Sequence, residues 1–263
     1  MKRAINAVGL ALAIGLIGAS DARADGVRDI APTGTLRVAI AVGPAPSTFW
    51  ATRDATTGKA KGVTVDLAKA AADKLQVPLQ LVEYPNSGEI AAASDKDAWD
   101  ISFMPADAER EKFVDMGPAY VEYASGYLVR AGSDIRALAE VDRDGTKVGC
   151  IDGTATSRTL TRTLKHASLT KFPQAEVAAE RIGKGEIDAL SMGLEALEDL
   201  AKKLPGTRVL DGAVQSTGVV VTVPKQRPAT RTWAAQFVAG AKADGTVRRA
   251  FDNNGFGQVK VAP

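Results

Sequence analysis

The 263-residue chain has one cysteine, Cys150, and one histidine, His166. A single cysteine excludes an intramolecular disulfide, and we expect Cys150, in the segment TKVGCID, to be a small buried residue. A metal site or a Ser-His-Asp catalytic system lacks parts, because no second histidine or cysteine accompanies His166. We therefore expect no metal and no cofactor.

The chain also lacks a basic stripe, sequence repeats and low-complexity linkers, and only 5% of its residues are aromatic. Few aromatic residues and no clustered basic ones leave no support for nucleic-acid binding. The composition, 45% apolar and 24% charged, is that of an ordinary soluble protein and not of a disordered one.

The first 24 residues carry the three parts of an export signal. Lys2 and Arg3 precede an apolar run over 7–19, and the sequence ARA at 22–24 has the small residues that a signal peptidase requires. The run is shorter than the roughly 20 apolar residues of a membrane span. We expect cleavage after residue 24 and a mature protein in the periplasm.

Cleavage would also remove the net charge. The full chain has 33 basic and 31 acidic residues, a formal charge of +2. The signal contains Lys2, Arg3, Arg23 and Asp21, so its removal takes away three positive charges and one negative charge. The charge of residues 25–263 is then 0, and the basic pI of the full chain comes from the signal.

The mature part alternates strand-like and helix-like segments. The strand-like segments are 36–42, 78–84, 146–152, 169–172 and 187–191, and the helix-like segments are 62–75, 154–167, 175–183 and 194–204. Strand, helix and strand with short links favour right-handed crossovers in parallel sheets. We predict an α/β fold with two mainly parallel sheets and helices on both faces.

Two further extended segments, ASGYLVRAG at 124–132 and STGVVVTVPK at 216–225, bracket the second set of strands. If these segments run side by side, they join two lobes by a pair of hinge strands. A cleft then lies between the lobes.

The order of the landmarks along the chain resembles the family 3 periplasmic solute-binding proteins of ABC importers, which often carry polar amino acids. These landmarks are GTLRVAI, KGVTVDLAKAAADKL, WDISFMPADAEREKFVDMGPAYVEYASGYLV, KVGCIDGTATSRTL, IGKGEIDAL, GVVVTVPK and AKADGTVRRAFDNNGFG. The resemblance covers essentially the whole mature chain and implies a type II two-lobed fold that closes on its ligand. It places lobe 1 at 25–126 and 219–263, lobe 2 at 130–217, and hinges near 127–129 and 216–218.

The resemblance also assigns a role to Arg110. In the family, an arginine shortly before a DFS-PY stretch binds the ligand carboxylate, and here Arg110 precedes FVDMGPAY. A guanidinium group matches a carboxylate with two parallel hydrogen bonds. The preceding loop is shorter than in relatives, and Pro105 has no N–H to donate. Met104 and Pro105 would offer apolar surface, while Asp107 would donate its N–H or cap the short helix that carries Arg110.

Other ligand contacts follow from the same resemblance. Thr154 and Ala155 begin a helix whose free N–H groups would face the cleft. Phe49, next to Trp50, lies where relatives use an aromatic residue to cover the ligand, although core packing explains it equally well. Asn86 lies where an aromatic residue usually lines the pocket, and its amide would suit a hydroxyl or amide group of the ligand.

One family feature is missing. The aspartate that usually holds the ammonium group of the ligand corresponds to Gly193, which follows Met192. An unpaired buried ammonium group would be costly. Either another acid takes the role, with Glu122, Asp152 and Glu195 as candidates, or the ligand is not an ordinary α-amino acid. The second alternative is slightly favoured.

The resemblance implies a monomeric, non-enzymatic protein that captures a small carboxylate-bearing ligand between two closing lobes. The ligand would be an amino acid, an amino-acid derivative or an organic acid, delivered to an ABC transporter permease in the inner membrane. Two alternatives remain. A dehydratase-type enzyme on the same fold would use Arg110 and one cleft acid, and a ligand-sensing protein would present its closed state to a membrane receptor.

Export generates the first prediction. The periplasmic protein should have the mass of a chain that begins at Asp25, because the tripartite signal is cleaved after residue 24. Intact-mass spectrometry of a periplasmic extract measures this. A product that still contains Lys2 and Arg3 would refute both the cleavage and the localisation.

Overall fold

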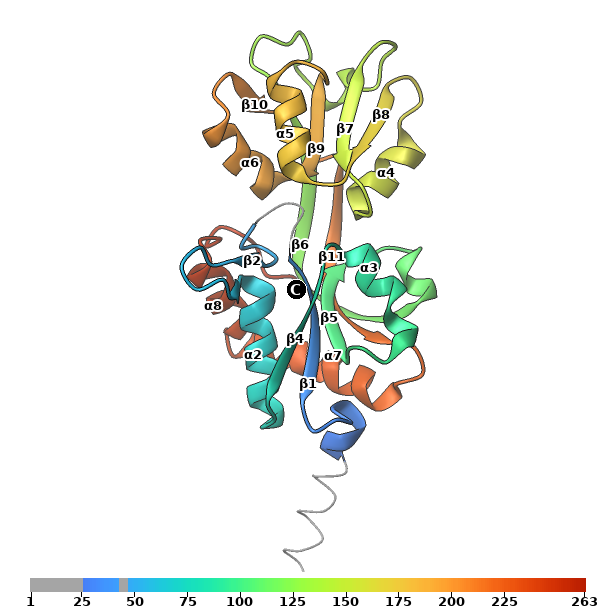
Figure 1. The fold of residues 1–263 in the computed structure, drawn as a ribbon, viewed down its shortest axis with the longest axis vertical. Helices are drawn as coiled ribbons and strands as arrows, with labels where there is room; N and C mark the ends of the chain where they lie inside the picture. The colour runs from blue at the N-terminus through green and yellow to red at the C-terminus, as the bar shows by residue number, and fades with distance from the viewer. Residues whose placement is uncertain (1–25, 43–46) are drawn as a thin grey trace, which may run out of the picture.

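A computed structural model describes residues 26–42 and 47–263 of the chain. Two lobes are stacked along the long axis, and the strands β6 (Val114–Arg130) and β11 (Gln215–Pro224) run between them (Figure 1). The predicted signal peptide lies outside the described residues, and its cleavage stays a prediction.

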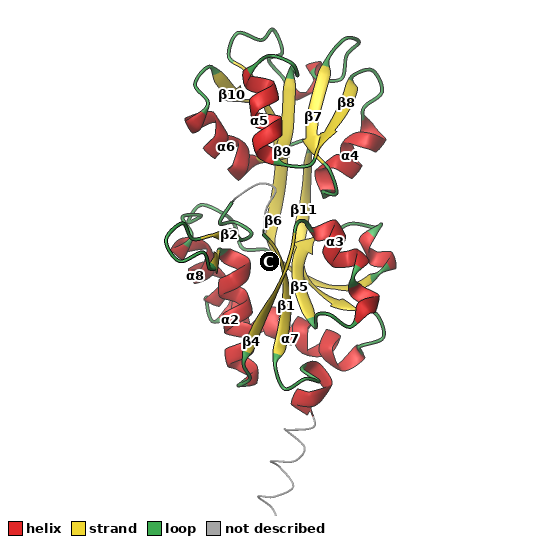
Figure 2. Ribbon diagram, viewed as in Figure 1, coloured by secondary structure: helices red, strands yellow, loops and turns green. Residues whose placement is uncertain are grey.

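The first lobe has a sheet with the strand order β4-β1-β5-β11-β6. Its strands besides β6 and β11 are β1 (Leu36–Ala41), β4 (Leu79–Tyr84) and β5 (Ile101–Pro105), and a small hairpin has β2 (Thr52–Arg53) and β3 (Ala60–Lys61). The helices around the sheet (Figure 2) are α2 (Val63–Leu75), α3 (Ser87–Ala92), α7 (Pro228–Ala243) and α8 (Thr246–Asn253), with short 3-10 turns at Ser94–Lys96 and Arg110–Lys112.

The second lobe continues the same sheet in the order β6-β9-β7-β8, with β10 paired to the end of β6. Its strands are β7 (Lys147–Ile151), β8 (Ser168–Phe172), β9 (Ala189–Gly193) and β10 (Thr207–Val209). Its helices are α4 (Ala155–Thr163), α5 (Ala175–Gly183) and α6 (Leu194–Lys203), with a 3-10 turn at Leu138–Glu140. β7, β8 and β9 are parallel, as predicted for a sheet built from crossovers.

The two extended segments expected to form the hinge, 124–132 and 216–225, do not run side by side over most of their length. β11 pairs with β6 from Gln215↔Ser125 to Pro224↔Val114, so the segment 216–225 lies mainly beside the first half of β6. The segment 124–132 instead lies beside β9 and β10. The reason is that β6 begins at Val114, well before the extended segment recognised in the sequence. One hydrogen-bonded sheet therefore continues from lobe to lobe.

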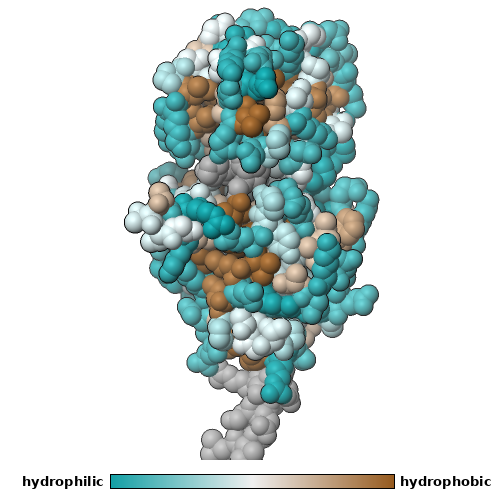
Figure 3. Space-filling model, viewed as in Figure 1, coloured by the Kyte–Doolittle hydropathy of each residue, from teal (hydrophilic) through white to brown (hydrophobic). Residues whose placement is uncertain are grey.

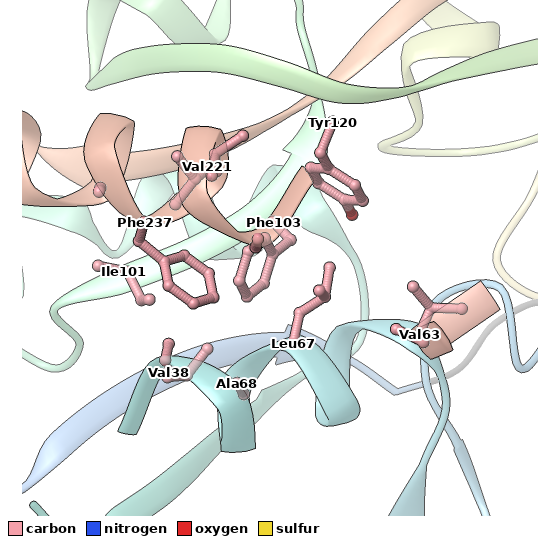
Figure 4. Close-up of a cluster of buried hydrophobic side chains, with 14 of the residues drawn as sticks. Val38, Val63, Leu67, Ala68, Ile101, Phe103, Tyr120, Val221 and Phe237 are labelled. Atoms are coloured by element: carbon pink, nitrogen blue, oxygen red, sulfur yellow. The ribbon is translucent and has the colours of Figure 1, made fainter. Parts of the chain in front are cut away.

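The buried apolar residues divide between the lobes. In the first lobe, Val38, Leu67, Phe103, Val221 and Phe237 belong to one cluster between the sheet and the helices (Figure 4). The second lobe has separate clusters on each side of β6, around Leu128 and Val129. The predicted hinge at 127–129 thus includes residues that are buried in the core of the second lobe.

Helix α2 shows how the sequence forms these elements. Val63, Leu67, Ala68, Ala71 and Leu75 recur at helical spacing and are all buried. The helix ends at residue 76, which adopts the left-handed conformation two residues before a proline. The apolar face of the helix packs on the sheet, while its exposed face carries charged residues.

The outer surface of both lobes is largely hydrophilic on the face that Figure 3 shows. Among the large apolar side chains of the described residues, Phe113 is the exposed one, with 52% of its surface accessible. No helix within 26–42 and 47–263 combines the length and apolar character needed to cross a bilayer.

A buried carboxylate ties the sheet of the first lobe to the start of α7. Asp100 is fully buried and accepts hydrogen bonds from the backbone N–H and the guanidinium of Arg37. Arg227 Nη1 donates to the same carboxylate at 2.7 Å. Removing the carboxylate would leave Arg37 and Arg227 with only the exposed carboxylate of Asp97 as a counter-charge.

Asp100→Ala should therefore lower the free energy of unfolding by about 3–5 kcal/mol, the usual cost of breaking a buried ion pair from one side. Asp115→Ala is the matched control, because Asp115 pairs with Lys225 near the surface and such pairs contribute about 0–1 kcal/mol. Urea denaturation followed by circular dichroism measures both. Equal losses in the two variants would contradict the structural role of Asp100.

Candidate functional site

A pocket lies between the lobes, at the carboxyl ends of the parallel strands of both, where α/β sheets commonly bind ligands. From the first lobe and β6, it is lined by Ala41, Ser47, Trp50, Asn86, Ser87, Phe103, Pro105 and Tyr123. From the second lobe, it is lined by Ile151, Thr154, Ala155, Thr156, Ser191, Met192, Gly193, Glu195 and Ala196. The space between these walls is about 800 Å³ when the open mouth is included.

Six of the residues predicted to contact a ligand line this pocket: Asn86, Pro105, Thr154, Ala155, Met192 and Gly193. Two of them also cap helices. Asn86 Oδ1 accepts from the N–H of Glu89 at 3.0 Å, and Thr154 Oγ1 accepts from the N–H of Ser157 at 3.1 Å. Capping fixes the orientation of both side chains at the pocket edge. Their contact with a ligand stays a prediction.

Five predicted residues are not among those that line the pocket. Arg110 and Asp107 lie behind its wall, and Met104, Phe49 and Glu122 lie elsewhere. Met104 is fully buried on the opposite face of β5 from Phe103 and Pro105, because successive strand residues point to opposite sides. Phe49 packs in the core against Phe251 and other aromatic rings, and its neighbour Trp50 faces the pocket instead. Glu122 is exposed to solvent, while the next residue on β6 turns inward.

Arg110 lies directly behind the pocket wall and is only 2% exposed. Its Nη1 donates to the carbonyl of Pro105 at 3.0 Å and its Nη2 to Ser87 Oγ at 2.6 Å, and both of these residues line the pocket. Arg110 Nε is buried without a partner. A buried guanidinium with an unused donor can bind an anion that reaches it.

Asp107 caps the turn that carries Arg110, as predicted for one of its two possible roles. Its Oδ1 accepts from the N–H groups of Glu109 and Arg110. The neighbouring N–H of Ala106 is already used, because it donates to the carbonyl of Gly218 at 2.8 Å. The loop after β5 therefore has fewer free donors for a ligand than the sequence suggested.

Asp107 also joins the two lobes. Arg158, on α4, donates from Nε to Asp107 Oδ2 at 3.0 Å, and its Nη2 is buried without a partner. Burial and the charge of Arg158 lower the pKa of Arg110. Although burial alone would raise it, the hydrogen bond and charge of Arg158 lower the pKa of Asp107. Two arginines thus share one carboxylate, which leaves an excess positive charge at this end of the pocket.

Tyr123 is a pocket residue that the sequence reasoning missed. Its hydroxyl accepts hydrogen bonds from the indole of Trp50 and the N–H of Gly193. Burial and the charge of Glu195 raise the pKa of Tyr123, whereas Arg110 lowers it. The Tyr123 hydroxyl therefore lies between a basic and an acidic group. Its position opposite exposed Glu122 on an alternating strand was the signal that could have found it.

Glu195 is the acidic group of the pocket. It belongs to the first turn of α6, and its carboxylate accepts from its own N–H and that of Ala196. Burial, together with the nearby charges of Glu198 and Asp199, raises its pKa to about 8 in spite of these hydrogen bonds. A carboxyl group with this pKa is partly protonated near neutral pH.

The described residues contain no group of three or more side chains suited to hold a metal ion. Cys150 is buried in the core of the second lobe, as predicted. His166 is exposed, lies beside Asp144 and is not among the residues that line the pocket.

Fold and site together define a class: two α/β lobes, joined by two long strands, with a pocket between them, are the architecture of type II periplasmic binding proteins. The model of the bacterial extracellular solute-binding proteins, family 3, matches residues 36–257, and the chain belongs to this family. Its relatives are mostly binding proteins.

Individual relatives are distant. The chain is 27% identical over 166 residues to a glutamine-binding protein of Geobacillus stearothermophilus, which is 59% of this chain and 60% of that one. The solute receptor for L-cysteine of Neisseria gonorrhoeae superposes with a TM-score of 0.79 at 22% identity, covering 90% and 99% of the two chains. An ancestral amino acid-binding protein, a precursor of cyclohexadienyl dehydratase, gives 0.75 at 24% identity and covers 87% and 98%.

The raised pKa of Glu195 generates a stability prediction. The folded-state pKa of about 8 exceeds the ordinary value of 4.5, so the folded state loses stability as pH rises from 4.5 to 8. Glu195→Gln has no ionisable group at this position, so it should not lose stability in this way as pH rises. Its melting temperature should be close to that of the wild type at pH 5 and higher by roughly 3–10 °C at pH 9.

Differential scanning fluorimetry at the two pH values measures this difference. Glu176→Gln is the control, because Glu176 is exposed on α5 and this variant should show no gain between pH 5 and pH 9. A Glu195→Gln variant with the same melting temperature as the wild type at pH 9 would contradict the burial of this carboxylate.

Proposed function

We propose that the protein captures a small ligand of the amino-acid class between its lobes and delivers it to an ABC importer. The carrying observation is the pocket itself, which both lobes line and which has a basic group, Arg110, and an acidic group, Glu195, near the hydroxyl of Tyr123. Closure of two lobes on a ligand buries it and gives an importer a shape to recognise.

Arg110 is the proposed partner of the ligand carboxylate. Its guanidinium is already held by Pro105 and Ser87, has an unused Nε donor, and faces an excess of positive charge from Arg158. A ligand carboxylate that displaces the Ser87 hydroxyl would relieve both the missing hydrogen bond and the repulsion. The glutamine-binding relative supports an amino acid as the ligand.

The cellular context follows from the family, whose members are extracellular solute-binding proteins. The chain spans 60% and 52% of the lengths of the two glutamine-binding relatives it matches. We propose a monomer in the periplasm whose partner is an ABC transporter permease in the inner membrane. The lobes would divide near 122–125 on β6 and 215–218 on β11, where the buried clusters change from one lobe to the other.

The protein is proposed to be a binding protein and not an enzyme. Two observations support the dehydratase alternative. Glu195 is a carboxyl group in the cleft, and its raised pKa suits a proton donor. The chain is also structurally similar to a dehydratase precursor. Mass spectrometry of the bound ligand after long incubation separates the two. A binding protein returns the ligand unchanged.

The function is tested by ligand-induced stabilisation. A screen of amino acids and small organic acids at millimolar concentration should include a ligand that raises the melting temperature. Binding to the folded state alone adds about 2.7 kcal/mol at a hundredfold excess over Kd. The absence of any hit across these classes would contradict the proposed function.

Arg110→Ala should weaken binding of that ligand by about 2–5 kcal/mol, because a carboxylate would be left unpaired in a closed site. Arg110→Lys should also bind poorly, since lysine lacks the planar fork. Arg181→Ala, which removes an exposed arginine of α5, is the control and should bind normally. Titration calorimetry measures all four proteins, and unchanged affinity in Arg110→Ala would refute the carboxylate contact.

A further inference from the structure

The carboxylate of Glu195 occupies the space beside Gly193 that any side chain at position 193 would need. A Cβ atom added to Gly193 would lie 2.6 Å from each carboxylate oxygen of Glu195 and 2.3 Å from the hydroxyl of Tyr123. Both distances are far below van der Waals contact. Because residue 193 is a glycine, the carboxylate of Glu195 can occupy the part of the pocket wall that a side chain at position 193 would otherwise fill.

We propose that Glu195 takes the place of the missing acid at position 193 and binds the ammonium group of the ligand, which restricts the ligand to amino acids with an uncharged side chain. This inference rests on the proposed function, because it needs a ligand of the amino-acid class. It reverses the preference that the sequence suggested, since a suitable acid is present after all.

Helix capping alone does not explain Glu195. Its hydrogen bonds from the first turn of α6 would be made equally well by an exposed carboxylate, and those bonds favour the charged form. The largest charge effects on it come from two acids, Glu198 and Asp199, and the Tyr123 hydroxyl on β6 also interacts with it. Neither of these two charged groups is a cation. A ligand ammonium would supply the missing counter-charge.

The opposite end of the pocket carries the complementary charge. Arg110 and Arg158 share the single carboxylate of Asp107, and the Tyr123 hydroxyl feels both Arg110 and Glu195. A zwitterion placed with its carboxylate toward Arg110 and its ammonium toward Glu195 would neutralise both ends. A ligand with only a carboxylate would leave Glu195 without a cation.

The pocket has no acid for a second cation. Glu195 is the only carboxylate among the described lining residues, and the undescribed stretch 43–46, GPAP, contains no ionisable side chain. The ammonium of a lysine side chain or the guanidinium of an arginine ligand would therefore be buried without a partner, which is costly. Asn86 and Thr154 instead offer neutral polar groups.

The first experiment is titration calorimetry at pH 8.5 with L-glutamine, L-asparagine, L-serine and L-cysteine, followed by L-arginine and L-lysine. At least one of the four neutral amino acids should bind more tightly than both basic ones. Glu195→Gln should weaken the tightest of the four by at least about 30-fold. Glu176→Gln, which removes an exposed carboxylate of α5, should bind like the wild type. Unchanged affinity in Glu195→Gln would overturn the inference.

A rescue experiment tests whether a carboxylate at position 193 can replace the carboxylate of Glu195. Because the Tyr123 hydroxyl also lies 2.3 Å from a Cβ atom at position 193, the test is made in a Tyr123→Phe background. Glu195→Ala/Tyr123→Phe removes the carboxylate and frees the space beside Gly193, so this variant should bind weakly. Adding Gly193→Asp returns a carboxylate to the same place and should recover at least tenfold of the lost affinity. A folded triple variant that binds no better than Glu195→Ala/Tyr123→Phe would overturn the claim that the two positions are equivalent.

Proton release gives a readout that a purely structural role would not produce. Because the free carboxyl group is largely protonated at pH 7 and an ammonium needs it ionised, binding should release close to one proton in the wild type and none in Glu195→Gln. Calorimetry at pH 7 in phosphate and in Tris, which differ in ionisation enthalpy, measures the number. Affinity should rise from pH 6 to pH 8.

The deaminated analogue of L-glutamine, glutaramate, separates this inference from the proposed function. If glutaramate binds the wild type as tightly as L-glutamine does, or if its affinity falls as pH rises while none of the four amino acids binds, ligand capture stands and the role of Glu195 is refuted. If neither the amino acids nor the carboxylic acids bind, the proposed function itself fails, and this inference fails with it.

Discussion

The pairing of β6 with β11 is the constraint on which the rest of the structure depends. Both strands belong to both lobes, and their antiparallel ladder runs from Val114 to Ser125 on β6. On either side of the crossing, the strands enter separate buried clusters, so each lobe keeps its own core. Two stable bodies connected by paired strands can rotate against each other while their cores stay intact, and the surface between them becomes a site that opens and closes.

The chemistry of that site comes from a few buried ionisable groups whose charges are not balanced by neighbours of opposite sign. Two arginines act on the single carboxylate of Asp107, and Glu195 forms no ion pair within the part of the chain that the structure describes. Charges interact more strongly away from water, so each unbalanced end attracts a group of opposite sign. The same imbalance costs folding stability, as the raised pKa of Glu195 indicates. A binding site that disfavours its own empty state has a physical reason to close on a ligand.

Several features could be predicted from the sequence because they depend on local patterns. The helix α2 follows from its apolar spacing, and the cap at Asp107 follows from an aspartate just before a short helix. Asn86 and Thr154 were predicted at the pocket and line it, since residues that follow parallel strands meet at one edge of a sheet. Met104 and Phe49 were placed less well, because which face a strand or loop residue takes depends on the partners that pack against it.

The sequence by itself determined the order of strands and helices, the family, and the absence of an acid at position 193, because each of these is written in residue types and their spacing. Only the tertiary structure decided where the charges go. Whether the carboxylate of Glu195 reaches the pocket depends on the direction in which α6 leaves β9, on the bare backbone of Gly193, and on the hydroxyl of Tyr123 arriving from another strand. Packing brings Tyr123 from a distant part of the chain to Gly193 and the start of α6. Burial among these groups, not residue type, sets the protonation of the carboxyl group.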